Sequence, residues 1–288
     1  MDRHDVPAAH IEYCVRHGGD LARLGREELA RQLPSLPFPP EVRRLVRERL
    51  PFVLAVGGAD KAHFRPAFAE ATPSVSVGPC RQRPAGYATL QMLLAKSIGE
   101  PYRQHPDLAN DIVHDVFPAE DQLDAPNTSA GATAPFGFHT DKSCSATRAG
   151  SPGWVTLACV RNLEGGVTSV ASLHSLTAVL APADRSTLGQ SSFRFGAGRS
   201  NVGPILGTDG DGAPTIRLST DMTPLTPAAA TAYRALLDAA DAVAGAVVLA
   251  PGEVLFLPNR ACVHSRHRFV PHREPGRRRF LQRVYIRG

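Results

Sequence analysis

The sequence predicts a β-sandwich or β-barrel with helices packed on its outside. Three observations lead to this fold class. Helical patterns fill the first part of the chain, short β-rich segments separated by turn signals fill the second part, and one clear helix interrupts those segments. This order is typical of a layered or closed antiparallel sheet. The chain has 288 residues, 43% of them hydrophobic, which suffices for a sizeable core and excludes wholesale disorder.

Periodicity and capping signals predict the helices. Residues 7–50 carry apolar side chains at helical spacing among charged ones. Residues 88–99 form a further expected helix that ends at Gly99, a residue common just past a helix C-terminus. The interrupting helix begins with Thr226 as N-cap and Pro227 in the first turn, and continues through AAATAYRALLDAADAV.

The predicted strands are short and bounded by Gly, Pro and Asn. They lie at residues 153–162, 166–173, 214–219, 245–259 and 278–287. The loop over 118–137 is long and rich in Gly, Ala, Pro and Ser, which is typical of functional or mobile loops. No boundary signal divides the chain, so we expect one domain over 1–288, with a helical or mixed part over 1–85 and the β core over 86–288.

Cysteine usage and hydropathy indicate the compartment. The five cysteines form no CxxC pair, which argues against a disulfide scaffold or a structural zinc site. We therefore expect a reduced, cytoplasmic protein. No apolar run reaches the roughly 18 residues of a membrane span, and the N-terminal MDRHDVPAAH lacks the apolar core of a signal peptide. We expect no membrane partner.

The net charge of +5 comes from one block. Residues 260–288 hold nine arginines and one glutamate, a net of +8, so the rest of the chain is slightly acidic. Such a block can bind nucleic acid, or it can combine a few working arginines with solvated ones. Its aromatic residues are only Phe269, Phe280 and Tyr285, and its arginines fall on a strand and a turn-rich loop. We therefore expect no nucleic-acid partner and keep a basic-tail nucleic-acid-binding protein as an alternative.

The motif with chemical promise is His139-Thr140-Asp141. In a strand, residues i and i+2 face the same side, so this histidine and carboxylate can bind one metal. Three other pairs have the same spacing, namely His10/Glu12, His105/Asp107 and His272/Glu274. Only the pair at 139 and 141 directly follows an apolar segment, Phe136-Gly137-Phe138, and precedes a series of predicted strands.

A third ligand is expected from a distant strand. The segment GEVLFLPNRACVH is an apolar strand, a Pro-Asn turn and a further segment that ends at His264. Two histidines and one carboxylate leave three positions open, an arrangement that suits non-haem Fe(II) with a co-substrate and O₂. Taken alone, His264 is better interpreted as a structural histidine that caps a strand.

Arginines on the last strand give a second signal. Strand alternation places Arg279, Leu281, Arg283 and Tyr285 on one face. Arginines that point into a barrel are costly unless paired, and a bound dicarboxylate would pair with one of them. The alternative is a surface strand with solvated arginines.

Four segments carry a resemblance to a known family. FHTD, GWVTLACVRNLEGGVTSVAS, PGEVLFLPNRACVHSRHRF and RRFLQRVYI follow one another as in clavaminate synthase-like Fe(II)/2-oxoglutarate oxygenases of the taurine dioxygenase superfamily, which the chain resembles from about residue 86 onward. It resembles members that hydroxylate free arginine or asparagine in antibiotic pathways. The resemblance implies a mainly β fold with flanking helices and a double-stranded β-helix (jelly-roll) core.

The resemblance also implies cofactors, a reaction and site residues. It implies Fe(II), with 2-oxoglutarate and O₂ as co-substrates, and hydroxylation of an unactivated C–H, at the β or γ carbon, of a free polar or basic amino acid. The loop over 118–137 becomes a candidate lid. The implied site residues are His139, Asp141 and His264 at the iron, Thr168, Arg279 and Arg283 around 2-oxoglutarate, and Gln104, Ser129 and Asp221 at the substrate.

The chain departs from the family pattern at three places. Many relatives have Glu where this chain has Asp141, but either carboxylate can bind iron, and its presence argues against halogenation. The relatives' acidic pair is reduced to Asp221, which weakens the case for arginine itself. The segment SRHRFVPHREPGRRRF, which follows His264, is one residue longer than in the relatives, so either Arg278 or Arg279 can match the arginine that binds 2-oxoglutarate. We choose Arg279 because Phe280 and Leu281 then align with the aromatic-leucine pair of the family.

Several alternatives stay open. The same chemistry can act on a carrier-bound amino acid or another acid, and desaturation or ring formation can replace hydroxylation. A catalytically silent iron-binding partner protein is the other non-enzyme alternative. We expect a small-molecule amino-acid substrate, and the sequence does not indicate the oligomeric state.

Overall fold

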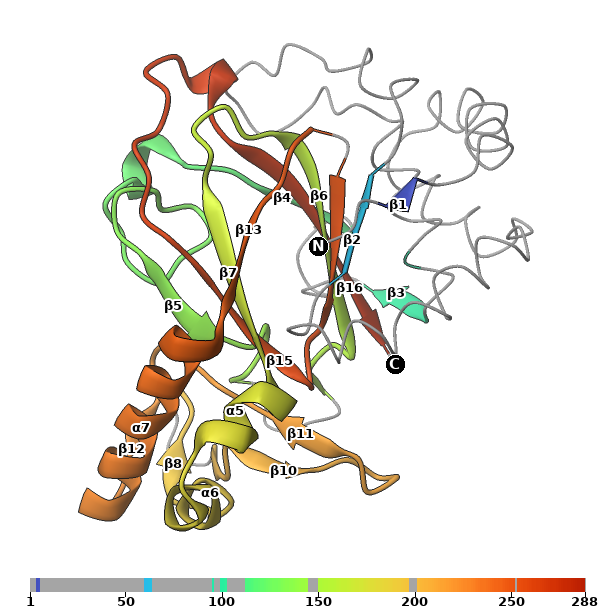
Figure 1. Cartoon of the computed structure of the whole chain (residues 1–288). Coiled ribbons are helices and arrows are strands. Elements are labelled where there is room, and N and C mark those ends of the chain that lie inside the picture. Colours follow the sequence, from blue (N-terminus) through green and yellow to red (C-terminus); the bar gives the residue numbers. More distant parts are fainter. Residues whose placement is uncertain are drawn as a thin grey trace.

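The computed structural model describes residues 4–5, 60–63, 95, 99–102, 112–144, 150–196, 201–251 and 253–287. Two antiparallel sheets pack face to face, and helices cover the outside of the smaller one (Figure 1). This arrangement is the expected jelly roll. The helices expected over 7–50 lie outside the described residues. The helix expected over 88–99 is described only at its end, where the Gly99 amide donates to the carbonyl of Ala95.

The larger sheet forms one wall of the core. Its described strands, in spatial order, are β1 (His4–Asp5), β2 (Asp60–His63), β14 (Glu253–Pro258), β6 (Trp154–Arg161), β16 (Phe280–Arg287) and β3 (Glu100–Tyr102), with β4 (Val113–Val116) also paired to β16. All pairs are antiparallel except β1 with β2. The strands β14, β6 and β16 are buried along nearly their whole length, because both faces are covered, and their sequences are correspondingly apolar.

The smaller sheet carries most of the groups singled out above. Its order is β13 (Gly245–Val248), β7 (Val167–Ser172), β15 (Cys262–Arg266) and β5 (Phe136–His139). His264 on β15 lies directly opposite His139 on β5, and Arg266 lies opposite Thr168 on β7. This register brings residues from three distant parts of the chain to one place on the inner face.

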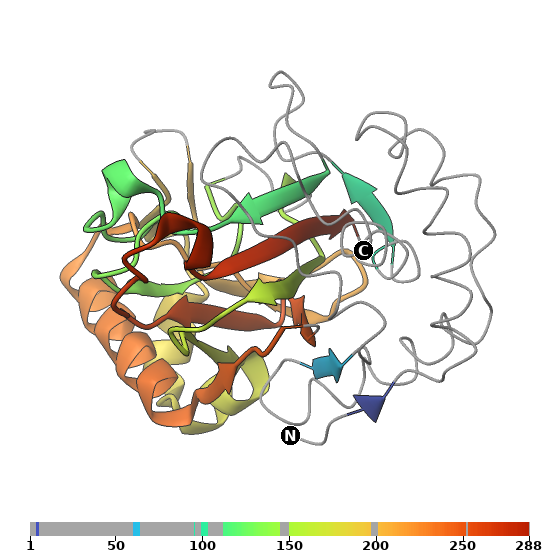
Figure 2. The same ribbon diagram turned by 90° about the horizontal axis from the view of Figure 1, so that it is seen from above.

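Helices and short strands form an outer layer (Figure 2). The helices are α5 (Leu173–Val179), α6 (Pro182–Leu188) and α7 (Pro227–Val243), and the short strands are β8 (Phe193–Arg194), β9 (Val202–Gly203), β10 (Leu206–Thr208), β11 (Pro214–Ile216) and β12 (Thr223–Pro224). Two 3-10 turns, η2 (Glu120–Gln122) and η4 (Pro275–Arg277), complete the described elements. The helix predicted at Thr226 is confirmed, and the Thr226 hydroxyl accepts a hydrogen bond from the Ala229 amide. In the part of the chain that is described, no helix is long and apolar enough to cross a membrane.

One expected strand is in fact two. The segment over 245–259 splits into β13 in the smaller sheet and β14 in the larger sheet. Pro251 lies between them, and a proline cannot donate to a strand ladder. The expected strand over 214–219 is likewise shorter and ends at Ile216. The division of the chain into a single domain stays a prediction.

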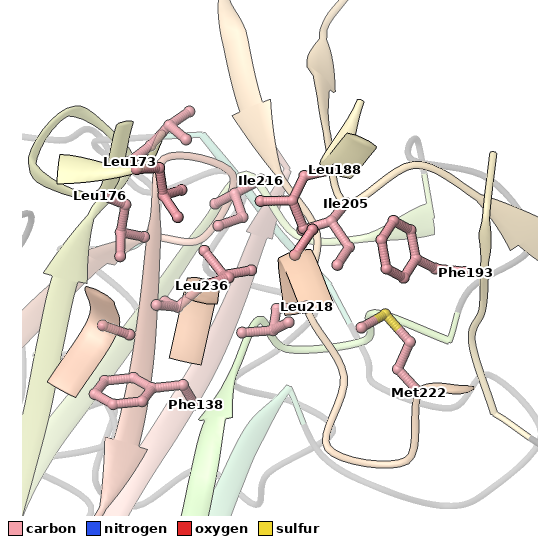
Figure 3. Packing of buried hydrophobic residues seen from close by; sticks show 14 of the residues in the cluster. Phe138, Leu173, Leu176, Leu188, Phe193, Ile205, Ile216, Leu218, Met222 and Leu236 are labelled. Atoms are coloured by element: carbon pink, nitrogen blue, oxygen red, sulfur yellow. The ribbon is translucent and has the colours of Figure 1, made fainter. Parts of the chain in front are cut away.

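Alternation along the strands produces two hydrophobic clusters. On β15, Cys262 belongs to the cluster between the sheets, whereas the next residue, Val263, belongs to the cluster beneath the helices. The outer cluster includes Leu176, Leu188 and Leu236, all fully buried (Figure 3). This cluster attaches the helical layer to the smaller sheet.

Truncation of Leu236 tests this attachment. We expect Leu236→Ala to lower the free energy of unfolding by about 2–5 kcal/mol, because it leaves a cavity in a closely packed cluster. Urea denaturation followed by circular dichroism measures the change. Leu163→Ala is the matched control: Leu163 is 58% exposed, so its truncation should change stability by less than about 0.5 kcal/mol. Equal effects of the two substitutions would contradict the packing described.

Candidate metal centre

Three potential metal ligands meet between the sheets. His139 ends β5, Asp141 lies in the turn that follows, and His264 lies on β15. One ligand atom from each lies within 4.8 Å of the others, and all three residues are buried. The sequence argument placed His139 and Asp141 on one strand face. The structure instead ends the strand at His139, so another contact must aim Asp141.

Asn259 makes that contact. Its side-chain oxygen accepts from the Asp141 amide at 2.8 Å, and its side-chain nitrogen donates to the Asp141 carbonyl at 3.1 Å. Asn259 is almost fully buried and donates also to the Pro152 carbonyl. This reciprocal pair fixes the backbone of Asp141 without a strand ladder. The sequence reasoning noticed the Pro-Asn turn but did not assign Asn259 to the site.

The two histidines are held as neutral metal ligands. The Nδ1 of His139 lies 2.8 Å from the Gly137 carbonyl, so it carries the proton and leaves the lone pair on Nε2. The Phe136 ring stacks on the His139 ring with centroids 3.8 Å apart. Burial lowers the pKa of both histidines, that of His264 to about 3, so both are unprotonated at neutral pH.

The two oxygens of the Asp141 carboxylate have different surroundings. Oδ1 accepts from the Arg283 guanidinium at 2.9 Å and from the Tyr285 hydroxyl at 2.9 Å. Oδ2 has no hydrogen-bond partner among the described residues and lies 3.5 Å from Nε2 of His264. Burial raises the pKa of Asp141, but Arg283 and the neighbouring groups bring it down to about 2. Burial also raises the pKa of Tyr285 well above its ordinary value, so this hydroxyl stays a donor.

These ligands fit a metal ion. A buried carboxylate oxygen without a hydrogen-bond partner is costly, and a cation would satisfy it. The two donors on Oδ1 leave a single oxygen for the ion. Two imidazole nitrogens and one carboxylate oxygen form the set that leaves positions open on non-haem Fe(II).

Arg279 lies in the same interior. It is buried, its guanidinium donates to the Thr168 hydroxyl at 3.4 Å, and its Nε has no partner in the described part of the chain. Gly166 makes room for it, because a Cβ there would lie 2.8 Å from Cδ of Arg279. Burial lowers the pKa of Arg279 to about 10, and the group remains a cation at neutral pH. A buried cation with an unused donor suits a carboxylate ligand.

Arg278 points elsewhere. Its guanidinium forms an ion pair with Glu120 at 2.5 Å and donates to the His272 carbonyl at 3.0 Å. Arg278 and Arg279, which directly precede β16, therefore point in different directions.

A pocket joins the metal ligands to Arg279. Its lining also includes Ser129, Thr168 and Arg283. The open volume is about 40 Å³, so the pocket is narrow. We expect side chains or the loop over 118–137 to move when a larger ligand binds.

The comparison with protein families decides the membership. The model described as "Taurine catabolism dioxygenase TauD, TfdA family" matches residues 87–285. The chain belongs to the TauD/TfdA family.

Two curated relatives support this membership. L-asparagine oxygenase of Streptomyces coelicolor is 30% identical over 227 residues, which are 75% of this chain and 66% of the relative. L-lysine 3-hydroxylase of Catenulispora acidiphila is 28% identical over 215 residues, which are 69% of this chain and 57% of the relative. The chain therefore spans less than two thirds of the length of either relative.

Solved structures confirm the fold. Asparagine oxygenase in complex with Fe(II), 2S,3S-3-hydroxyasparagine and succinate superposes with a TM-score of 0.82 at 23% identity, covering 99% of this chain and 93% of that one. The non-heme iron oxygenase OrfP in complex with Fe and alpha-ketoglutaric acid gives 0.80 at 23% identity, covering 100% and 94%.

The substrate residues expected from the resemblance are only partly placed in this TauD/TfdA site. Ser129 lines the pocket from the loop over 118–137. Asp221 is exposed and is not among the residues that line the pocket; its carboxylate accepts from the Ser219 hydroxyl and lies near the Cys144 thiol. Gln104 lies outside the described residues.

Sequence reasoning also missed Arg266. It lines the pocket, and its guanidinium donates to the carbonyls of Thr128, Ala132 and Ala134 in the 118–137 loop. The signal was available, because alternation on one strand places residue 266 on the same face as residue 264. Arg266 therefore ties the loop to the strand that carries a metal ligand.

Removal of the hydroxyl group that donates to the Asp141 carboxylate tests the metal centre. We expect Tyr285→Phe to weaken Co(II) binding about tenfold, because groups that orient a metal ligand have effects of about 10- to 100-fold. The visible absorption of Co(II) during a titration reports the affinity. Tyr233→Phe, on α7, is the control and should bind Co(II) as the unaltered protein does. Equal affinity of the two variants would show that Tyr285 does not support Asp141.

Proposed function

We propose that the protein is a non-haem Fe(II)/2-oxoglutarate-dependent dioxygenase that hydroxylates an unactivated C–H of a free amino acid with a polar or basic side chain. The observation that carries the proposal is the Asp141 oxygen without a partner, facing His264, in a pocket that also contains a buried arginine with an unused donor. The curated relatives are named for action on asparagine and lysine, and the titles of two structural neighbours give complexes with hydroxyasparagine and with hydroxyarginine.

Each residue has a role in this proposal. His139, Asp141 and His264 hold Fe(II), and Arg283 with Tyr285 keeps Asp141 in position through Oδ1. Arg279, with Thr168, binds the distal carboxylate of 2-oxoglutarate, and Arg283 adds a second cation beside the carboxylates. Fe(II) with 2-oxoglutarate supplies the activation of O₂ that C–H hydroxylation needs. The burial of the ligands excludes bulk water from this reaction.

The loop over 118–137 is proposed as a lid. It contributes Ser129 to the pocket, and Arg266 holds three of its carbonyls. Because the pocket is small as it stands, the loop is the segment we expect to move when substrate binds. Asp221, outside the lining, is proposed to meet a cationic side chain of the substrate, and Gln104 to contact the substrate from outside the described residues.

The basic block fits this proposal better than nucleic-acid binding. Of its arginines, Arg266, Arg278, Arg279 and Arg283 are buried. Buried arginines do not contact phosphates on a surface groove. We also propose a cytoplasmic location and a role in specialised-metabolite biosynthesis; the free thiols of Cys144, Cys159 and Cys262 are consistent with a reducing compartment.

A turnover assay tests the proposed reaction. The protein is incubated aerobically with Fe(II), 2-oxoglutarate and single free amino acids, including asparagine, lysine and arginine. We expect succinate to form together with a mass gain of one oxygen atom in one amino acid. His139→Ala should abolish both, because it removes a metal ligand, whereas the exposed His174→Ala should change neither. Mass spectrometry follows both products.

Each other outcome of this assay has a separate meaning. Succinate without a modified amino acid would indicate that the protein has the cofactor chemistry but that its substrate is carrier-bound. A desaturated or cyclised product would support the proposed cofactors but show that the reaction is not hydroxylation. Absence of succinate from protein that binds iron would contradict the proposal.

A pair of adjacent substitutions tests which arginine binds 2-oxoglutarate. We expect Arg279→Met to raise the KM for 2-oxoglutarate by at least about tenfold, because a charge-assisted hydrogen bond contributes about 1.5–3 kcal/mol. Arg278→Met should leave this KM nearly unchanged, since its partner Glu120 is an exposed residue outside the pocket. Steady-state succinate formation measures both values. A larger effect at Arg278 would reverse the assignment.

A further inference from the structure

A second, larger cavity lies behind the metal centre. Its volume is about 450 Å³, and it opens between the hairpin of β10 and β11 and the C-terminal end of β16. It shares none of the described lining residues of the metal pocket. Thr140 and Asn259 line this cavity and connect it to the metal centre, since Thr140 precedes Asp141 in the chain and Asn259 bonds the Asp141 backbone. A volume of about 300–1,000 Å³ is usual for small-molecule sites.

The charges that line this cavity do not balance. Its charged residues in the described part are three arginines and one acid, Asp209. Asp209 already accepts from two backbone amides of its own turn. Arg217 is likewise engaged, because it donates to the Ser143 carbonyl and to Asn201 and lies over the Phe195 ring. The cations left for a ligand are Arg260 and Arg287.

Arg260 and Arg287 have no carboxylate partner within the described residues. Arg260 makes one long hydrogen bond, 3.4 Å, to the Ser151 carbonyl, and its Nε is buried without an acceptor. The guanidinium of Arg287 lies 4.9 Å from the centre of the Tyr102 ring. Two cations at one cavity, whose single acid accepts from amides of its own turn, favour an anion.

The Tyr102 hydroxyl is a further donor close to Arg287, although Tyr102 is not among the residues that line the cavity. It is buried and lacks a hydrogen-bond partner in the described part of the protein. Burial raises the pKa of Tyr102 to about 12, while Arg287 and Arg260 act in the opposite direction because both cations lie close to it. The hydroxyl therefore stays protonated at neutral pH. Water could accept from these donors, but only an anion also offsets the two positive charges.

We propose that this cavity binds a small molecule through an anionic group, a carboxylate or a phosphate, held by Arg260 and Arg287. Planar guanidinium groups bind both anions with paired hydrogen bonds. The remaining volume takes the body of the molecule against Ile216, with the hydroxyls of Thr208 and Thr215 beside it. This site is distinct from the 2-oxoglutarate position proposed at Arg279, and it does not depend on the proposed function.

The site would lie next to a metal ligand. Asn259 lines the cavity and also holds both backbone groups of Asp141. A ligand here would therefore contact the residue that aims the metal-binding carboxylate.

Calorimetric titration of two simple anions tests the proposal. Inorganic phosphate and acetate are titrated separately into the full chain at constant ionic strength. We expect saturable binding of at least one anion, and the tighter of the two identifies the anionic group. Arg260→Met should weaken this binding about tenfold or more. Arg287→Met should do the same, and because Arg287 is exposed this second variant should fold even if the first does not.

Two control variants make the result specific. Arg234→Met removes one exposed cation from α7 and should leave anion binding unchanged. Arg279→Met should also leave it unchanged, because Arg279 lines the other pocket. Absence of saturable binding, equal weakening by Arg234→Met, or loss through Arg279→Met alone would overturn the proposal. No amino-acid substrate or turnover is involved, so neither result bears on the proposed oxygenase activity.

Discussion

The buried carboxylate of Asp141 is the charge on which the interior depends. Placing an ion between two sheets costs several kcal/mol unless partners compensate it. Arg283 and Tyr285 on β16 compensate the charge through Oδ1, while Asn259 after β14 holds the Asp141 backbone and His264 on β15 faces Oδ2. Both sheets therefore contribute to one charged group. Removal of any one partner leaves the others buried with unmet hydrogen-bonding capacity, so the pieces of the site depend on one another as well as on the fold.

Local patterns predicted the fold class and the place of the metal centre. Alternation on β16 predicted that Arg279, Arg283 and Tyr285 share an inward face, and the preceding apolar segment selected the pair at 139 and 141 from four of equal spacing. The choice against His272/Glu274 agrees with its geometry, because the Glu274 amide donates to the His272 ring within a tight local turn. Such inferences succeed where the alternation of side chains along a strand determines which face of the sheet each residue occupies.

What the sequence did not reveal depends on contacts between distant segments. The clamp of Asn259 on Asp141 and the hold of Arg266 on loop carbonyls both join parts of the chain more than a hundred residues apart. No local pattern encodes them. The segment over 245–259 divides between two sheets for a similar reason. Its apolar residues can pack in either sheet, and only tertiary packing determines that β13 joins one sheet and β14 the other. Asp221 shows the same limit at one contact, since Cys144, 77 residues away in the sequence, meets it only through folding.

The opposite placement of His139 and His264 has a consequence for the order of assembly. The two residues face each other across β5 and β15, yet the chain between them contains β6 and β14 of the larger sheet, β7 and β13 of the smaller sheet and all three described helices. Pairing of segments so distant is slow, because the loop entropy must be lost before the contacts form. A slip of one residue would turn one imidazole to the outer face. The full set of metal ligands therefore exists only once these strands have paired, and metal binding favours the molecules that hold the native register.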